Sequence, residues 1–538
     1  MKKALSLLTG FALMASLLCQ SVMAEESTGV IFEPDQAIVE TGVGTVRGYI
    51  EDGIFTFKGI PYATAERFQE PQPITWEGIK PAVVYQGQAP QADQSTGNAE
   101  TMMPHLFWPT VTDESLIQSI NIWTPGTDDG KRAVLFWIHG GGFSSGSAYE
   151  QICFDGQFLS RRGDVVVVSI NHRLNCLGFL DLSSFGEEYA NSGNLGMMDI
   201  VAALQWVKDN IAAFGGDPDN VTVFGQSGGG RKILNLMGTP AAQGLFAKAI
   251  GESCGQQSIP QEIAKKVGEE TVAMFGDSVD DIKDVPYREL VAAATAALAK
   301  VNEEEGTGYA WSPVAGGDWM PVDIWLQDDI GDASKDVPLL IGSNFAEVTT
   351  NAFAFMGGPD PIYKNSFTEE EVDAYLTDKY GDAKDAVVAA FQEAYPLKPI
   401  IDAGFVDVNT YRAWVKAVLP KKAAQEGTAP IYNYVFAYEL PNMGGWLPFH
   451  CSELPFVWHN VDSEKLTVGT VPETYALSDL MSDAWISFAK TGDPNHEGMI
   501  EWPQWTLEDG ATMIFDTECT IGHNHDDKLM EEIAKAAQ

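Results

Sequence analysis

The chain has 538 residues, of which 45% are hydrophobic and 11% aromatic, and its formal net charge is −42. This composition excludes a disordered protein, which needs low hydrophobicity, and predicts a folded globular protein with a large core. The strongly negative charge disfavours nucleic acid and anionic membranes as partners.

The N-terminus has the features of a secretory signal peptide. Lys2 and Lys3 precede an apolar stretch at residues 4–18, and small residues then lead to Ala24. We expect cleavage after Ala24, which would leave residues 25–538 as the mature chain in a secreted or periplasmic location. No later stretch is apolar and long enough to span a bilayer.

The six cysteines give little sign of a metal or redox site. Cys19 lies in the leader, and a lipid anchor there is a minority alternative because Leu18 is a poor residue before such a cysteine. The other cysteines form no close CxxC pair, so we expect no metal site. Their number is odd, so at least one is unpaired in a monomer, and export permits a disulfide without requiring one. They are Cys153, Cys176, Cys254, Cys451 and Cys519.

Short apolar runs bounded by Gly, Pro or Asp recur along the chain and predict strands that are buried on both faces. The clearest helical pattern between them covers residues 194–214 and is ended by Gly215. Such alternation predicts one α/β domain, with a mainly parallel sheet flanked by helices on both faces. Its site is expected at the carboxyl ends of the strands. The predicted strands cover residues 133–138, 164–170, 221–224 and 338–341.

A glycine run follows the first of these predicted strands, between His139 and Phe143. Successive glycines let backbone N–H groups turn toward a ligand oxygen, as an oxyanion hole requires. A phosphate-binding loop is the alternative, but no G-K-[ST] follows and basic residues are scarce nearby.

The third predicted strand runs into the sequence Gly225-Gln226-Ser227-Gly228-Gly229. A G-x-S-x-G turn between a strand and a helix lifts a serine hydroxyl out of the sheet. The bare pattern is common by chance, and a plain glycine-rich loop is the alternative. Its position directly after a strand favours a nucleophile at Ser227.

A serine nucleophile needs a base and an orienting acid. Among eight histidines, His450 is the best candidate by its sequence surroundings, although a lone histidine is more often structural. Glu347 follows a predicted strand and lies between Ser227 and His450 in the chain, the order expected in an α/β-hydrolase. Position alone would leave Glu347 an ordinary loop acid.

Taken together, the motifs resemble those of the type B carboxylesterases, a family that includes cholinesterases and bacterial para-nitrobenzyl esterases. The resemblance implies an α/β-hydrolase fold, with Ser227 as nucleophile, Glu347 as acid and His450 as base. It also implies an oxyanion hole formed by the backbone N–H groups of Gly141, Gly142 and Gly228, and no cofactor. The matching stretches follow one another through nearly the whole chain, at residues 57–63, 67–68, 139–143, 194–196, 206–218, 225–229, 347, 450–456 and 485–503.

The chain departs from the family pattern at several positions. The elbow usually reads G-E-S-A-G in the family, whereas Gln226 and Gly228 replace the glutamate and the alanine here. The family's early disulfide would join the positions of Ala89 and Ser115, so both of its cysteines are missing together.

The predicted function is therefore hydrolysis of small-molecule carboxylic esters through an acyl-enzyme. A lipase, an amidase or a carbamate hydrolase would use the same residues, and a cholinesterase-like binding protein without activity is the least favoured alternative. Four aromatic residues flank the site in sequence, and we expect about two of them to line a substrate pocket while the others pack in the core. They are Phe143, Phe345, Trp446 and Phe449.

Overall fold

The structure, a computed structural model, describes residues 29–31, 33, 36–91, 112–348, 364–441 and 445–537. The predicted signal peptide, with Ala24 and Cys19, lies outside the described residues.

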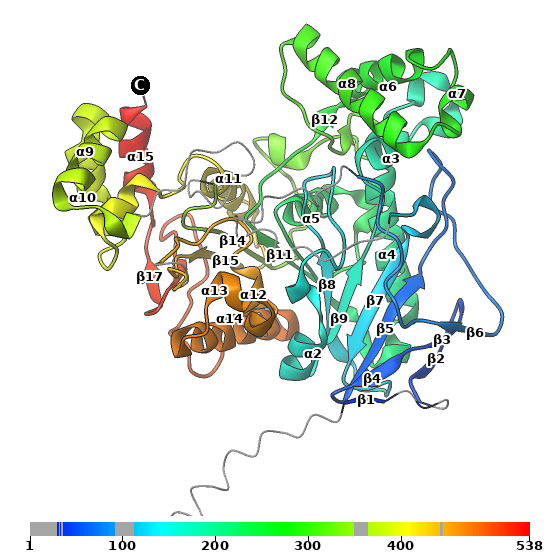
Figure 1. Cartoon of the computed structure of the whole chain (residues 1–538), viewed down its shortest axis with the longest axis horizontal. Coiled ribbons are helices and arrows are strands. Elements are labelled where there is room, and N and C mark those ends of the chain that lie inside the picture. Colours follow the sequence, from blue (N-terminus) through cyan, green and yellow to red (C-terminus); the bar gives the residue numbers. More distant parts are fainter. Residues whose placement is uncertain are drawn as a thin grey trace, which may run out of the picture.

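Within these residues, twelve strands form one sheet in the order β1-β4-β5-β7-β9-β8-β10-β11-β14-β15-β16-β17 (Figure 1). Strands β9 to β16 in this order run parallel, and the flanking strands are antiparallel. The strands of this sheet are β1 (Val30–Ile31), β4 (Tyr49–Glu51), β5 (Ile54–Pro61), β7 (Ser119–Thr124), β8 (Arg132–Ile138), β9 (Val166–Ile170), β10 (Gly216–Gln226), β11 (Lys248–Glu252), β14 (Leu339–Asn344), β15 (Ile431–Phe436), β16 (Thr512–Phe515) and β17 (Thr520–Gly522).

The four strands predicted from apolar runs are confirmed as β8, β9, β10 and β14. The predicted helix over residues 194–214 is confirmed as α4 (Leu195–Asn210) and a final 3-10 turn. Gly215 then takes a left-handed conformation with φ of 75°, which glycine adopts without a steric penalty. The predicted mostly parallel sheet of an α/β-hydrolase fold is therefore correct.

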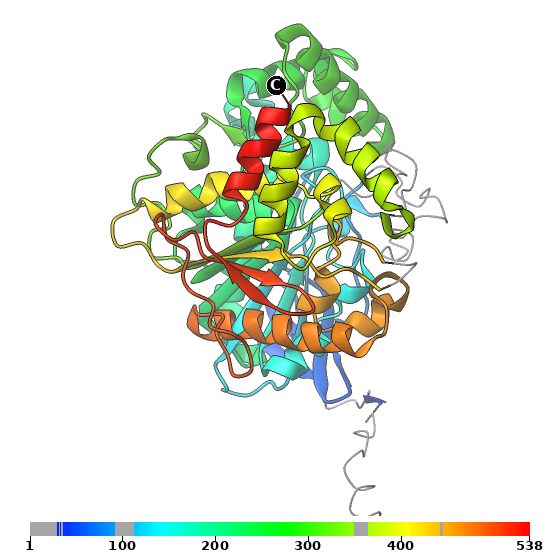
Figure 2. The same ribbon diagram turned by 90° about the vertical axis from the view of Figure 1, so that its left-hand side faces the viewer.

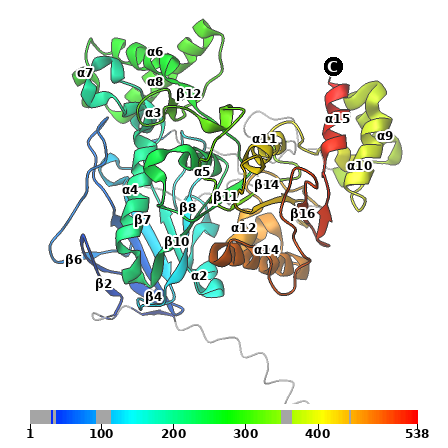
Figure 3. The same cartoon turned by 180° about the vertical axis from the view of Figure 1, so that it is seen from behind.

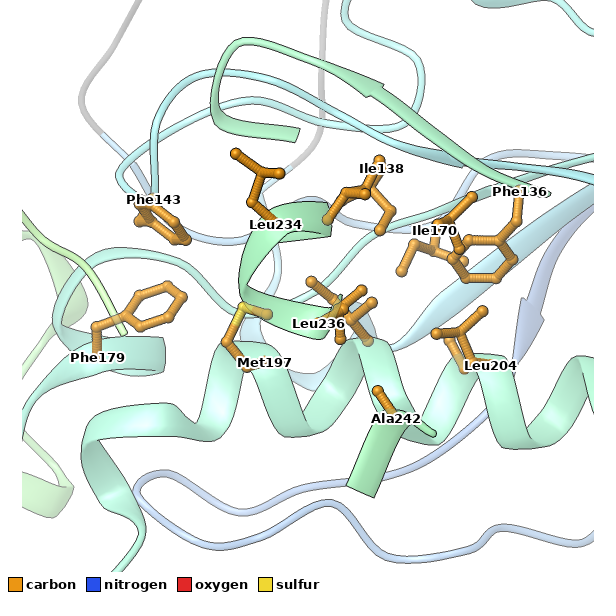
Figure 4. Packing of buried hydrophobic residues seen from close by; sticks show 14 of the residues in the cluster. Phe136, Ile138, Phe143, Ile170, Phe179, Met197, Leu204, Leu234, Leu236 and Ala242 are labelled. Carbon is orange, nitrogen blue, oxygen red and sulfur yellow. The ribbon is translucent and has the colours of Figure 1, made fainter. Parts of the chain in front are cut away.

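Each face of the sheet is covered by its own apolar layer. Along β8, the side chains of Val134, Phe136 and Ile138 enter one layer, and those of Leu135 and Trp137 enter the other. Figure 4 shows the first layer, where β8 and β9 meet α4 and α5. Because successive strand residues point to opposite faces, an uninterrupted apolar run is what a sheet covered on both sides requires.

The helices on the first face are α3 (Asn175–Phe179), α4, α5 (Gly228–Gly238) and α11 (Tyr411–Ala423) (Figure 3). Those on the second face are α2 (Gln157–Gly163), α12 (Leu454–Val457), α13 (Lys465–Val468) and α14 (Pro472–Thr491), all labelled in Figure 1.

Two further groups of helices lie away from the sheet (Figure 1). The first contains α6 (Gln261–Ala273), α7 (Asp280–Lys283) and α8 (Tyr287–Glu305), beside the short β12 (Ile259–Pro260) and β13 (Val314–Ala315). The second contains α9 (Glu369–Tyr380), α10 (Lys384–Ala394) and α15 (Asp527–Ala536), with α15 packed against α10 (Figure 2). A small sheet of β2 (Ile38–Thr41), β3 (Gly44–Arg47) and β6 (Ile79–Pro81) lies near the N-terminal edge.

The five cysteines among the described residues are all free thiols. None of the helices described has the length and apolar character needed to cross a bilayer.

Candidate active site

Ser227 lies at a sharp turn between β10 and α5. Its backbone has φ of 56° and ψ of −118°, a strained conformation for a residue with a side chain. The turn is held by a hydrogen bond from the Ser227 N–H to the carbonyl of Glu252 at 2.8 Å. The carbonyl of Ser227 accepts the N–H of Arg231 at 3.0 Å, which starts the helix. This is the geometry that the G-x-S-x-G pattern predicts.

Glu347 and His450 form a direct pair although 103 residues separate them. The Nδ1 atom of His450 lies 2.6 Å from Oε2 of Glu347, whose side chain is fully buried. Oε1 of Glu347 accepts the backbone N–H of Asn344 at 2.7 Å, so both carboxylate oxygens are fixed. Since a carboxylate only accepts hydrogen bonds, Nδ1 is the donor and Nε2 is left as the basic nitrogen.

The end of β14 also holds the segment that carries His450. The Asn344 side chain donates to the carbonyl of Phe449 at 2.7 Å and to Oε2 of Glu453 at 2.5 Å. The backbone N–H of His450 donates to the carbonyl of Glu347 at 2.8 Å. One strand end therefore positions both members of the acid–histidine pair.

Two side chains connect this pair with the serine. The ring of Tyr411 lies 4.3 Å from the imidazole of His450, centroid to centroid, and its hydroxyl lies near the side chain of Ser227. Burial raises the pKa of Tyr411 to about 12, so its hydroxyl is neutral. The amide nitrogen of Gln226 lies 3.3 Å from Nε2 of His450. The structure thus brings Ser227, His450 and Glu347 into one cluster.

The glycine loop lies directly against the elbow. Gly141 and Gly142 have φ of 78° and 64°, conformations that glycine adopts without a steric penalty. The backbone of Gly142 is so close to Gly228 that a Cβ atom on Gly228 would overlap both the nitrogen and the oxygen of Gly142. The three residues predicted to form an oxyanion hole are therefore neighbours in space.

This close approach makes Gly228→Ala a test of the loop position. The added methyl group meets backbone atoms of Gly142, so the loop must move away from the elbow. We expect kcat for ester hydrolysis to fall by about 10- to 100-fold, because backbone donors act only at the right distance from the oxyanion. Steady-state kinetics will measure the change. The control is Gly308→Ala, where the new Cβ meets no atom within 4 Å. Equal activity of the two variants would contradict the predicted role of the loop.

A buried lysine supports the same loop. The Lys232 ammonium group is fully buried and donates to the carbonyl of His139 at 3.0 Å. It also lies 5.6 Å from the ring centroid of Phe143. Burial lowers the pKa of Lys232, whereas the nearby Glu150 carboxyl opposes this shift. One side chain therefore contacts both ends of the glycine loop, at His139 and at Phe143.

The four aromatic residues predicted near the site are packed to different extents. Phe143 makes an edge contact with Phe179, with centroids 5.2 Å apart, and both rings appear in Figure 4. Phe143, Phe345 and Phe449 are buried and expose almost no surface. Trp446 is only partly buried. Of the four, Trp446 has the surface needed for contact with a ligand.

Some residues at the site were not foreseen from the sequence. Tyr411 and Trp414 belong to α11, about 185 residues after the elbow, and no local pattern marks them. Arg231 and Lys232 do have a signal, because two basic residues directly follow the glycine run in a chain with 33 basic and 75 acidic residues. In the described ranges, no group of three or more His, Cys, Asp or Glu side chains is placed to hold a metal ion.

Glu252, whose carbonyl anchors the elbow, carries a buried carboxyl group. Its Oε1 accepts the indole N–H of Trp485 at 2.6 Å, and its Oε2 makes no hydrogen bond within the part of the chain that the structure describes. Burial raises the pKa of Glu252 to about 8. In the unfolded chain a glutamate loses its proton near pH 4.5. The folded state therefore keeps a proton that the unfolded state loses, and this group lowers stability as the pH rises from about 4.5 to 8.

Replacing Glu252 with glutamine is expected to weaken this pH dependence. A glutamine keeps an oxygen for Trp485 and cannot ionise. The share of the pH-dependent loss of stability that comes from Glu252, up to about 1.4 kcal/mol per pH unit, should therefore disappear. Melting temperatures of the wild type and Glu252→Gln at pH 5 and pH 8 will show the difference. Glu370→Gln, at an exposed position, is the control. If the Glu252→Gln and wild-type profiles run parallel, the carboxyl is not neutral in the folded protein.

A mostly parallel sheet, a serine at a strand–helix elbow and a buried acid–histidine pair after a later strand together define the α/β-hydrolase class of enzymes. Comparison with known proteins identifies the family within this class. The model of the carboxylesterase family matches residues 35–532, and the chain belongs to this family. It is a carboxylic ester hydrolase.

The relatives described next match this chain along nearly their whole length. The para-nitrobenzyl esterase of Bacillus subtilis is 34% identical, and the match covers 92% of this chain and 98% of the relative. The phenmedipham hydrolase of Pseudarthrobacter oxydans is 31% identical over 89% of this chain and 95% of its own. An esterase from Clostridium hathewayi, described as able to hydrolyse aliphatic aromatic polyesters, has a solved structure that superposes with a TM-score of 0.84. It shares 39% identity and covers 94% of this chain and 99% of its own.

Proposed function

We propose that the chain hydrolyses carboxylic esters through an acyl-enzyme on Ser227, with His450 as the general base and Glu347 as the orienting acid. The observation that carries this proposal is the 2.6 Å contact between His450 and Glu347, in a cluster with the elbow serine. The contact fixes the imidazole with its proton on Nδ1 and its basic nitrogen on Nε2.

The reaction follows from this arrangement. His450 takes the proton of the Ser227 hydroxyl as the oxygen attacks the ester carbonyl. The N–H groups of Gly141, Gly142 and Gly228 stabilise the oxyanion, and the buried Glu347 carboxylate stabilises the imidazolium. His450 then gives its proton to the departing alcohol. Water, activated by the same imidazole, releases the acid and restores the serine.

The names of the similar proteins suggest a class of substrates. The Clostridium hathewayi esterase is described as acting on aliphatic aromatic polyesters, and the Bacillus subtilis relative is a para-nitrobenzyl esterase. We propose that the substrates here are likewise esters with aromatic groups, which the partly exposed Trp446 and Trp414 can contact. The bile salt-activated lipase of Mus musculus is 30% identical, so a lipase is the second candidate.

A fluorophosphonate probe tests the chemistry directly. The probe should label the native protein with a stoichiometry of one, and peptide mass spectrometry should place the label on Ser227. A burst of para-nitrophenol from para-nitrophenyl acetate should appear if deacylation is slower than acylation. A folded protein that reacts with neither reagent would be a binding protein instead. Activation by emulsified triglyceride above its solubility limit would favour the lipase.

Export is a separate part of the proposal. The order of basic, apolar and small residues before Ala24 supports a cleaved signal peptide and a single mature domain of residues 25–538. N-terminal sequencing of the protein secreted from its own cells tests this expectation, and a mature N-terminus at Met1 would reject it.

A further inference from the structure

Arg231 is a cation close to the proposed reaction centre. It lies on α5 one turn after Ser227, whose carbonyl accepts its backbone N–H at 3.0 Å. The centre of its guanidinium group lies 6.0 Å from the ring centroid of Tyr411. The same Tyr411 ring lies 4.3 Å from the imidazole of His450, centroid to centroid. The guanidinium group and the acid–histidine pair therefore share one aromatic neighbour.

Among the residues that the structure describes, no carboxylate forms a salt bridge with the guanidinium group of Arg231. Its only hydrogen bond to a side chain in the described ranges goes from Nη1 to the amide oxygen of Gln257. Its Nε atom is buried and makes no hydrogen bond to any described residue. The buried Arg173 differs, since its Nε and Nη2 atoms both bond to the carboxylate of Asp199. An arginine has five donors in a planar fork, and Arg231 uses few of them.

Aromatic surroundings hold the guanidinium group in place, and Arg231 itself is only partly buried. The guanidinium centre lies 4.8 Å from the ring centroid of Trp414, and the Trp414 side chain is 39% exposed. Trp414 also packs so closely on Gly255 that a Cβ there would overlap it. An arginine fixed on an aromatic surface loses little freedom when it binds an anion. A partly desolvated cation of this kind is stabilised when a carboxylate approaches.

We propose that Arg231 is a specificity-determining residue that binds a free carboxylate on the substrate, so that the enzyme acts on esters carrying a second, unesterified acid group. The inference rests on the proposed function, because it needs the ester bond to be attacked by Ser227. Monoesters of dicarboxylic acids and acyl esters of hydroxybenzoic acids have this chemistry. The acidic surface of the protein repels such anions at a distance, so a local cation is needed to hold them.

Matched substrates that differ in one charge provide the test. Para-nitrophenyl hydrogen glutarate and para-nitrophenyl pentanoate compare a charged with a neutral acyl group, and 4-acetoxybenzoate and phenyl acetate compare the leaving alcohols. In Arg231→Met, kcat/KM for at least one charged ester is expected to fall by about 10- to 100-fold, while values for the neutral esters stay within about threefold. Arg231→Lys should keep part of the preference.

The control is Arg161→Met, which removes one positive charge from the half-exposed face of α2, far along the chain from the elbow. It should leave all four values unchanged. An equal loss of kcat/KM for charged and neutral esters in Arg231→Met would mean that Arg231 supports the helix or the oxyanion instead. No loss of kcat/KM at all would mean that Arg231 has no role in substrate specificity. Either result overturns the inference while the neutral esters are still hydrolysed. If the wild type hydrolyses none of the four and resists the fluorophosphonate, the proposed function itself is wrong.

Discussion

Replacing Ser227 with alanine is expected to lower kcat for ester hydrolysis by about four to six orders of magnitude and to leave KM and the melting temperature nearly unchanged. Without the hydroxyl, no acyl-enzyme forms, and the remaining groups can only assist the slow attack of water. The strained backbone at residue 227 accommodates alanine as it does serine, because both have the same Cβ atom. Turnover of para-nitrophenyl acetate and melting by circular dichroism will measure the two effects.

Ser343→Ala is the matched control for this variant. Ser343 is buried on β14, and its hydroxyl makes no hydrogen bond in the described part of the chain. Its loss should affect neither turnover nor labelling by a fluorophosphonate. If Ser227→Ala keeps more than one hundredth of the wild-type activity, another nucleophile is at work and the proposed mechanism is wrong.

The sequence was most informative where local chemistry decides the structure. The apolar runs that became β8, β9, β10 and β14 are buried on both faces, so composition alone marks them. The elbow was predictable because few other turns combine a strand, two glycines and a serine before a helix. Glu347 was uncertain, since its carboxyl is one of 75 acidic groups, and only its position after β14 and its place in chain order favoured it.

The rest of the site depends on packing between distant segments. Tyr411 lies near both Ser227 and His450 because α11 packs on β14 and β15. Likewise, Phe345 and Phe449 flank the site in sequence but are buried in the core, while the polar contact is made by Glu347, two positions after Phe345, and by His450, one position after Phe449. No periodic pattern contains this information, because it arises from which side of a loop faces the sheet.

The second large loss of activity is expected when the acid–histidine pair is changed. Replacing Glu347 with glutamine is expected to lower kcat by about 10³- to 10⁴-fold. The oxygen of the new amide must accept the N–H of Asn344, which lies 2.7 Å from Oε1 in the native protein. The amide NH₂ group then faces Nδ1 of His450 and donates to it. The imidazole is forced into the tautomer with its proton on Nε2, where it cannot accept the proton of Ser227.

The opposite orientation of the amide would set its NH₂ group against the N–H of Asn344. Two donors would then meet in a buried site, and the folded protein would be less stable.

Glu453→Gln is the control that separates the effect of charge from that of side-chain shape. Glu453 is also buried and accepts from the Asn344 side chain at 2.5 Å, but burial raises the pKa of Glu453 well above its usual value, which favours the neutral acid. Its amide variant should keep kcat within about threefold, because an amide has the charge of the neutral acid and leaves the contact between Glu347 and His450 in place. Steady-state kinetics of the two variants at pH 7 will measure kcat. Equal losses of kcat would show that the site tolerates no amide at either position. A fully active Glu347→Gln would show that the carboxylate does not orient the histidine.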